Sequence, residues 1–280
     1  MKLSISNIAW RADEEEAVAD LMGEMGLEGI EIAPTKVWPF PLSVSASDLQ
    51  GYREFWLRRG IQIVAMQSLL FGRPDLTIFD TEEKRRETRD YLVGMIRIGG
   101  RLGAKTLVFG SPKNRRVGTL SLSEIERIAL PFFYDLGQVA MEEGVTFCIE
   151  PNPTAYECDF IITSREGRDL VARVNSKGFG LHLDAAGMTL SGEPIEPSIE
   201  SVFPAIKHFH ASEVNLAPVG SGSVNHPRFA SILNRLGYRN WVSIEMRAAD
   251  RAGNLAQVKA SVSWIASIYG ETKPSESGFV

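Results

Sequence analysis

Four metal-competent side chains stand at the ends of apolar, β-rich segments in the second half of the chain. They are Glu150, Asp184, His210 and Glu245, which end segments 145–150, 180–184, 206–210 and 241–245. Two glutamates, an aspartate and a histidine make a hard donor set dominated by oxygen, which suits Mn²⁺ or Mg²⁺ and also accepts Co²⁺ or Zn²⁺. A single acidic residue after an apolar run is usually a strand end that meets water. Four in succession indicate a site for one divalent cation.

The elements that would position these residues recur along the whole chain. Short runs rich in β-branched and apolar residues alternate with amphipathic segments such as 14–25, 82–102, 122–143, 165–174 and 228–236. The runs begin near Lys2, Gly29, Gln62, Lys105, Val145, Gly178, Ile206 and Trp241. This alternation predicts a single α/β domain, a (β/α)₈ TIM barrel over residues 1–270, followed by a polar tail at 271–280. A doubly wound open sheet is the alternative, but it gives no reason to end four strands in metal ligands.

The barrel prediction carries a geometric consequence for the four residues. The carboxyl ends of parallel barrel strands open onto one face, so side chains far apart in sequence converge there. Alternation along a strand also places His182 on the same side as Asp184, and His208 on the same side as His210. We interpret His182 as a core residue and His208 as one that could orient a neighbouring ligand. Glycines at 26, 60, 103, 144 and 237 follow helical segments and are predicted to end them in the left-handed conformation.

Composition limits the kind of partner. The 280 residues contain 30 Lys and Arg against 35 Asp and Glu, a net charge of −5, which disfavours a nucleic-acid partner. The two cysteines, Cys148 and Cys158, do not form the framework of a disulfide-rich protein. Residues 1–5 have the pattern of a strand rather than of a signal peptide, and no apolar run approaches the length of a membrane span. These features favour a reduced, cytoplasmic setting without membrane attachment.

Five short phrases carry a resemblance to a known family. They are Ile-Glu-Pro-Asn-Pro at 149–153, Leu-Asp at 183–184, His-Phe-His-Ala-Ser-Glu at 208–213, Pro-Val-Gly-Ser-Gly at 218–222 and Ser-Ile-Glu-Met at 243–246. In these phrases the chain resembles the xylose isomerase-like barrels, specifically the branch of ketose 3-epimerases and sugar phosphate isomerases. The resemblance implies that Glu150, Asp184, His210 and Glu245 hold one divalent metal ion. It also implies that Glu150 and Glu245 are the catalytic acid/base pair, and that the protein is a homo-oligomer, a dimer or a tetramer.

The chemistry requires such an arrangement independently of the resemblance. Removing a proton α to a sugar carbonyl leaves an enediolate with charge on oxygen, and a divalent cation stabilises that charge as a Lewis acid. With two carboxylates, one can take the proton and the other can return it from the opposite face, which is epimerisation. Return to the neighbouring carbon is aldose–ketose isomerisation. The sequence does not distinguish these outcomes, and it leaves open whether the sugar is phosphorylated.

Two departures from the family pattern concern the substrate. Relatives usually carry a histidine three residues after the aspartate, where this chain has Gly187, and an arginine three residues after the glutamate of the His-x-x-Glu phrase, where it has Leu216. A metal-dependent lyase or hydrolase acting on a keto-sugar or a related small carbohydrate is therefore an alternative function. An apurinic endonuclease would need a zinc cluster held by many histidines, and the chain has only four. A non-catalytic binding protein is the remaining alternative.

Six further residues are candidates for contacts with a sugar or sugar phosphate. Glu31 lies inside the second strand and Gln67 ends the third, and each could hold a hydroxyl or serve a structural role. Lys113 and Arg115 belong to a basic loop after the fourth strand that could bind a phosphate or carboxylate, or face solvent. Trp10 could stack on a sugar face or close the barrel end. Glu213 is the acidic residue of the His-x-x-Glu phrase.

Overall fold

The protein is a closed barrel of eight parallel strands, each paired with its neighbours in chain order and the last with the first. The computed structural model describes residues 1–249 and 253–270. The predicted (β/α)₈ barrel is confirmed, while the tail predicted at 271–280 lies outside the described residues. The strands are β1 (Lys2–Ser6), β2 (Gly29–Ile32), β3 (Gln62–Met66), β4 (Thr106–Phe109), β5 (Thr146–Ile149), β6 (Phe179–Asp184), β7 (Ile206–Ser212) and β8 (Trp241–Glu245).

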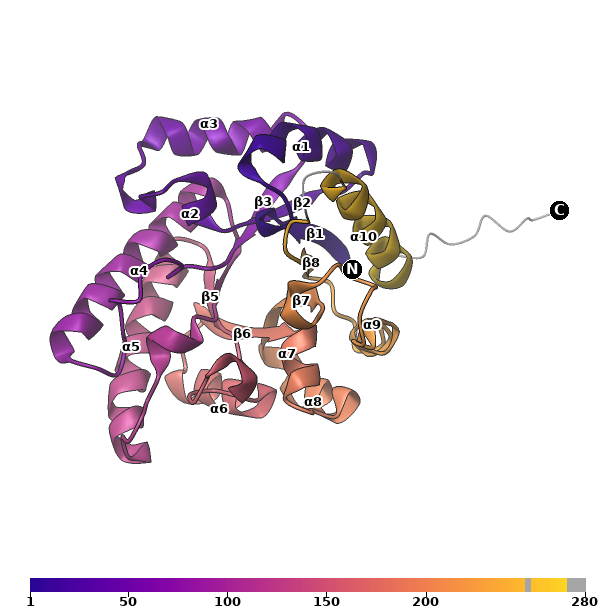
Figure 1. The fold of residues 1–280 in the computed structure, drawn as a ribbon. Helices are drawn as coiled ribbons and strands as arrows, with labels where there is room; N and C mark the ends of the chain where they lie inside the picture. Colours follow the sequence, from indigo (N-terminus) through magenta and orange to yellow (C-terminus); the bar gives the residue numbers. More distant parts are fainter. Residues whose placement is uncertain (250–252, 271–280) are drawn as a thin grey trace.

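Helices surround the strands as an outer ring (Figure 1). They are α1 (Glu15–Glu24), α2 (Pro34–Val37), α3 (Ala46–Leu57), α4 (Glu82–Leu102), α5 (Leu122–Glu142), α6 (Ser164–Val174), α7 (Ala185–Leu190), α8 (Ile195–Val202), α9 (His226–Arg235) and α10 (Asn254–Tyr269). The five glycines predicted to follow helices all have positive φ, as at Gly103 with φ 89°. Residues without a Cβ adopt this conformation without strain, so each helix can end abruptly before the next strand.

Apolar side chains fill the layer between the strands and the helices. Phe109 and Phe147 on neighbouring strands stack with ring centroids 5.5 Å apart, and Phe133 of α5 stacks on Phe179 of β6 at 5.2 Å. All four rings are buried. Because side chains alternate along a strand, the residues between these apolar ones point into the barrel instead. The same alternation therefore builds the core and leaves the barrel interior for polar groups.

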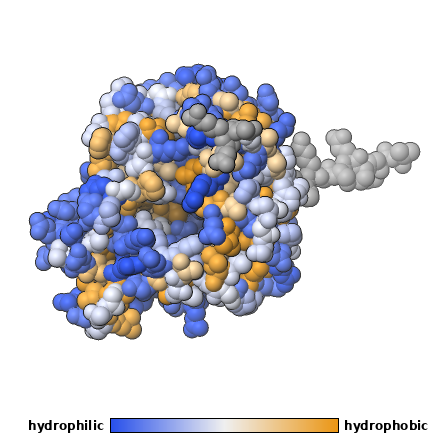
Figure 2. Space-filling view, in the orientation of Figure 1, coloured by the Kyte–Doolittle hydropathy of each residue, from blue (hydrophilic) through white to orange (hydrophobic). Residues whose placement is uncertain are grey.

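The face of the molecule drawn in Figure 2 is hollowed near the barrel axis. The walls of the corresponding cavity come from the segments that follow the strands, as barrel geometry requires. Among residues 1–249 and 253–270, no helix has both the length and the apolar character that a membrane span requires.

Candidate functional site

The four residues singled out at the strand ends meet at one place. In the strand register the Cα of Asp184 pairs with that of His210, and Ser212 pairs with Glu245. Glu150, Asp184 and His210 each offer a ligand atom, and these atoms lie within 4.8 Å of one another. The fourth member is adjacent, because Glu245 Oε2 lies 3.4 Å from His210 Nδ1. Barrel closure thus joins side chains that are up to 95 residues apart in the sequence.

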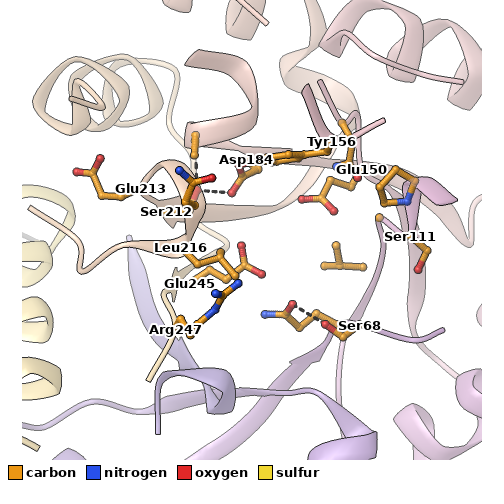
Figure 3. Close-up of a pocket in the computed structure, with 17 residues that line it drawn as sticks. Ser68, Ser111, Glu150, Tyr156, Asp184, Ser212, Glu213, Leu216, Glu245 and Arg247 are labelled. Atoms are coloured by element: carbon orange, nitrogen blue, oxygen red, sulfur yellow. Dashed lines mark hydrogen bonds between the residues drawn. The ribbon is translucent and has the colours of Figure 1, made fainter. Parts of the chain in front are cut away.

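The site forms the floor of a cavity of 530 Å³, within the size range of small-molecule sites. Figure 3 shows the carboxylates of Glu150, Asp184 and Glu245 directed into this cavity. Serine, asparagine and tyrosine side chains complete much of the wall: Ser68, Ser111, Asn152, Tyr156, Ser212 and Asn215. A wall of hydroxyl and amide groups suits a polyhydroxylated ligand, because each group can both give and accept hydrogen bonds.

The carboxylates differ in how firmly they are held. Asp184 is fixed by two donors, since its Oδ1 accepts from the Gly187 backbone N–H at 2.5 Å and its Oδ2 accepts from the Ser212 hydroxyl. No residue in the described part of the chain donates a hydrogen bond to the carboxylates of Glu150 or Glu245 that meets normal geometry. Gly110 leaves room for Glu150, because a Cβ there would lie 2.2 Å from Oε2. Asp184 is therefore held in one position by its two donors, whereas the carboxylates of Glu150 and Glu245 are not held in this way.

A buried carboxylate orients His210 from below. Glu31, with no exposed surface, accepts a hydrogen bond from His210 Nε2 at 2.9 Å and another from Ser243 Oγ at 2.8 Å. Its other oxygen lies 3.3 Å from His208 Nε2. With Nε2 directed at Glu31, Nδ1 of His210 is the nitrogen that could offer a lone pair to a cation once its own proton is displaced, and this atom is buried without a hydrogen-bond partner. A carboxylate behind the imidazole is the usual support for a metal-binding histidine.

Burial and mutual repulsion shift the ionisation of the site. Burial, followed by the charge of Asp184, raises the pKa of Glu150 to about 8. Burial and the charge of Glu245 raise the pKa of Asp184 to about 6. Burial opposes the charged form of His210, but Glu31 and Glu245 outweigh it and hold the pKa of His210 well above its usual range. Glu150 and Asp184 therefore keep their protons to a higher pH than carboxyl groups in water do.

The site fits a divalent cation on the observations above. The orphaned Nδ1 of His210 lies beside three carboxylates whose repulsion a dication would relieve. The donor set of three carboxylates and one imidazole is that of Mn²⁺ or Mg²⁺ sites.

The raised pKa of Glu150 predicts how stability depends on pH once metal is removed. A carboxyl with an ordinary pKa of 4.5 is ionised in the unfolded chain above pH 6.5, whereas the folded protein keeps its proton up to about pH 8. At this residue the folded state thus binds more protons, and the free energy of unfolding is expected to fall as pH rises from about 7.5 to 8, by roughly 1 kcal/mol per pH unit. Urea unfolding in EDTA at several pH values measures this slope.

The control for that measurement is Glu150→Gln, which removes the titrating group. His210 contributes in the same direction, because its pKa is raised, so the slope in this variant should shrink rather than vanish. The pKa values of His182, His208 and His226 are lowered by burial, so these residues are uncharged in the folded protein, whereas in the unfolded chain they lose their protons around pH 6.5; their opposing contribution becomes small above about pH 7.5. A flat profile, or the same slope in the variant, would contradict the prediction.

Two of the six substrate candidates line the cavity. Gln67, 4% exposed, lies at its edge and donates to Ser6 Oγ at 2.7 Å. Glu213 also lines the cavity but faces its own loop, where its carboxylate accepts from the N–H groups of Gly220 and Val224 at 3.4 and 3.3 Å. Glu31 lies beneath the cavity, where it contacts His210 rather than the open space.

The remaining three candidates lie away from the cavity wall. Arg115 is fully buried, and its Nη2 donates to the backbone carbonyl of Glu150 at 2.6 Å. Lys113 points outward with 74% of its side chain exposed, 3.6 Å from Glu157. Trp10 is buried against Trp56, with ring centroids 6.3 Å apart. The structure thus places Arg115 as a support for the Glu150 backbone, Lys113 on the surface, and Trp10 in the core.

The cavity wall contains residues that the sequence reasoning missed. Arg247 is the one Arg or Lys side chain among its described lining residues. The sequence did contain a signal for Arg247. It follows Glu245 by two positions, and in an extended segment this spacing places both side chains on the same side, as it does for His210 and Ser212. Tyr156 lies in a short turn after β5, for which no sequence pattern provided a signal. The backbone N–H of Arg247 donates to Leu216 O at 2.8 Å, so the arginine stands beside one of the two positions at which the sequence departs from the pattern that it resembles.

The other departure from the family pattern, Gly187, has a local reason. A Cβ at this position would lie 3.1 Å from Asp184 Oδ1, the oxygen that accepts the Gly187 N–H. A larger residue would have to press against the fixed carboxylate or move the start of α7.

Comparison with known families gives a match over most of the chain. The sequence model of the family described as xylose isomerase-like TIM barrel matches residues 19–268. A ketose 3-epimerase of Arthrobacter globiformis is 28% identical over 90 residues. That match covers 32% of this chain and 31% of the relative's own length.

Solved structures resemble the whole barrel. D-psicose 3-epimerase from Clostridium cellulolyticum H10, solved with D-tagatose, superposes with a TM-score of 0.81 at 18% identity, over 96% of this chain and 99% of that one. The 3-keto-D-glucoside 4-epimerase from E. coli gives a TM-score of 0.78 at 19% identity, over 95% and 99% of the two chains. At these identities the likeness shows a shared fold.

Proposed function

Because the chain belongs to the family of xylose isomerase-like TIM barrels, we propose that it is a divalent-metal-dependent epimerase or isomerase of keto sugars. The observation that carries the proposal is the convergence of Glu150, Asp184 and His210 within 4.8 Å, with Glu245 adjacent. The named relatives are epimerases, which favours proton transfer over the lyase or hydrolase alternative.

The proposed ligands are Glu150, Asp184, His210 through Nδ1, and Glu245. When bound, the cation lowers the cost of negative charge on the substrate oxygens as the α-proton leaves. Glu31 accepts from Nε2 of His210 and so keeps Nδ1 directed at the other ligands, and Ser212 and the Gly187 N–H hold Asp184. These contacts set the geometry before substrate arrives, so little reorganisation accompanies binding.

Glu150 and Glu245 are the proposed proton carriers. Neither carboxylate is tied by a regular hydrogen bond in the described part of the chain, so each can accept a proton from carbon and release it again. The pKa of Glu150, raised to about 8 by burial and by Asp184, shows how strongly the surroundings can favour its protonated form. If the two groups lie on opposite faces of the sugar, one removes the proton and the other replaces it, with inversion at that carbon.

Solvent deuterium exchange tests the proposed function. Mn²⁺-loaded protein incubated in D₂O with D-fructose, D-tagatose, D-psicose or L-ribulose should place deuterium on the carbon beside the carbonyl of at least one of them. Proton NMR should show the carbon skeleton retained, with an epimer or an aldose as product. Loss of water or of a fragment would support a lyase instead. Absence of exchange with every ketose, under both Mn²⁺ and Mg²⁺, would contradict the proposal.

A further inference from the structure

A second cavity shares part of its wall with the first. It measures 370 Å³ and is built by the segments that follow β3 and β4. Both cavities are lined by Ser68, Ser111 and Pro112, which we call the sill. Figure 3 places Ser68 and Ser111 across the first cavity from Ser212 and Glu213. A ligand that extends from the carboxylates over the sill would therefore enter the second cavity.

The sill has an unusual backbone. Ser68 has φ 53° and Ser111 has φ 43°, so two non-glycine residues adopt the left-handed conformation at the same boundary. Such residues are uncommon, and they occur more often at ligand-binding and active-site segments than elsewhere. Here both left-handed residues lie just after their strands, at the wall that the two cavities share.

The two segments that form the walls of the second cavity are hydrogen-bonded to each other. The Asn114 side-chain amide donates to Arg73 O at 2.7 Å and to Leu76 O at 2.6 Å, which joins the segment after β4 to the segment after β3. The backbone adds a third bond, from Ile78 N–H to Asn114 O at 3.0 Å. Asn114 is only 8% exposed, so these bonds are shielded from water. The second cavity is a preformed feature rather than a chance gap between loops.

The chemistry of the second cavity suits a neutral ring with one apolar face. Phe71 is 71% exposed, although an aromatic side chain of this size is usually buried. It lines the cavity with Pro74 and Pro112, beside the hydroxyl groups of the sill. Two cations also line the cavity, and each has an acidic partner: Arg73 bonds Asp75 at 2.7 Å, and Lys113 lies 3.6 Å from Glu157. An anionic group would have to compete with these acidic partners, whereas a sugar ring offers C–H bonds on its face to Phe71 and hydroxyls at its edge to the serines.

We propose that the second cavity binds a second sugar ring, so that the substrate is a glycosylated keto sugar rather than a free monosaccharide. This inference rests on the proposed function. The reacting ketose lies over Glu150, Asp184 and Glu245, and its far end crosses the sill. The attached ring stacks on Phe71, and its hydroxyls face Ser68 and Ser111.

Disaccharides that end in a free ketose test the proposal directly. Isomaltulose and lactulose carry a glycosyl group on O6 or O4 of fructose and leave the carbonyl and the C3 hydrogen available. With Mn²⁺-loaded protein in D₂O, at least one of them should show a kcat/KM for deuterium exchange about tenfold above that of D-fructose. Phe71→Ala should remove this advantage and leave D-fructose unchanged, and Phe71→Trp should keep it.

Phe40→Ala is the matched control, because Phe40 is 79% exposed and lines neither cavity. It should leave all rates unchanged. Equal rates for D-fructose and both disaccharides, unaffected by Phe71→Ala, would overturn the second sugar site while the proposed function stands. A change of oligomeric mass in Phe71→Ala by sedimentation, with unchanged rates, would show that Phe71 contacts a second copy of the chain, and would also overturn it.

Titration calorimetry with the two disaccharides keeps the tests of site and function separate. If no ketose exchanges deuterium, the proposed function fails, but binding of a disaccharide to the wild type and its weakening in Phe71→Ala would still support the second site. Binding that is absent, or equal in the two proteins, would contradict the site.

Discussion

Replacing either Glu150 or Glu245 with glutamine is expected to lower turnover by about 10²–10⁴-fold, the usual contribution of a general acid or base. The amide keeps an oxygen for weak coordination and nearly the same shape, but it cannot accept or deliver the proton. Deuterium exchange and product formation, measured at saturating Mn²⁺, separate the proton-transfer role from metal binding. Glu54→Gln makes the same chemical change on the outer helix α3 and should leave both rates unaffected.

The two variants should also differ from each other. If the carboxylates work from opposite faces, each variant should still exchange the proton of the epimer that faces the surviving glutamate, while interconversion of the epimers stops. Full turnover in one variant would show that its glutamate is a ligand alone. Full turnover in both would move proton transfer to another group, with Glu31 and Glu213 as the remaining acidic candidates near the site.

Asp184→Asn is expected to weaken Mn²⁺ binding by more than about 100-fold, because losing a direct ligand should exceed the 10–100-fold cost of losing a supporting contact. The change is mild for the fold. Asp184 caps α7 through the Gly187 N–H, and asparagine caps helices about as well as aspartate. Titration calorimetry should give one ion per wild-type chain and little binding in the variant, with exchange activity lost in parallel.

The matched control is Asp90→Asn on the outer helix α4, where the side chain is 63% exposed. His210→Gln provides a second test, since it removes the imidazole whose Nδ1 faces Glu245 at 3.4 Å. Unchanged Mn²⁺ affinity in both Asp184→Asn and His210→Gln, or an ion count other than one in the wild type, would contradict the proposed ligand set.

The sequence by itself predicted the barrel and the place where its polar residues meet. Alternating apolar and polar positions are a local signal, because neighbouring side chains on a strand point to opposite faces. Parallel strands joined by helices must end on the same face, so Glu150, Asp184, His210 and Glu245 could be expected to converge without knowing any contact between them. Glycines such as Gly103 predicted the helix ends for a similarly local reason, because glycine adopts positive φ without strain.

The contacts of the loops and of the barrel interior were decided by the tertiary structure. Glu31 contacts His210 although 179 residues separate them in the sequence, because barrel closure leaves only β1 and β8 between β2 and β7; no local pattern encodes this contact. Lys113 and Arg115 are two residues apart, yet one is exposed and the other is buried beneath Glu150. Their short 3₁₀ turn after the left-handed Ser111 sends neighbouring side chains in different directions. The same turn, meeting Ser68 from another loop, forms the sill. The sill forms only because the packing of the whole barrel brings these two loops together.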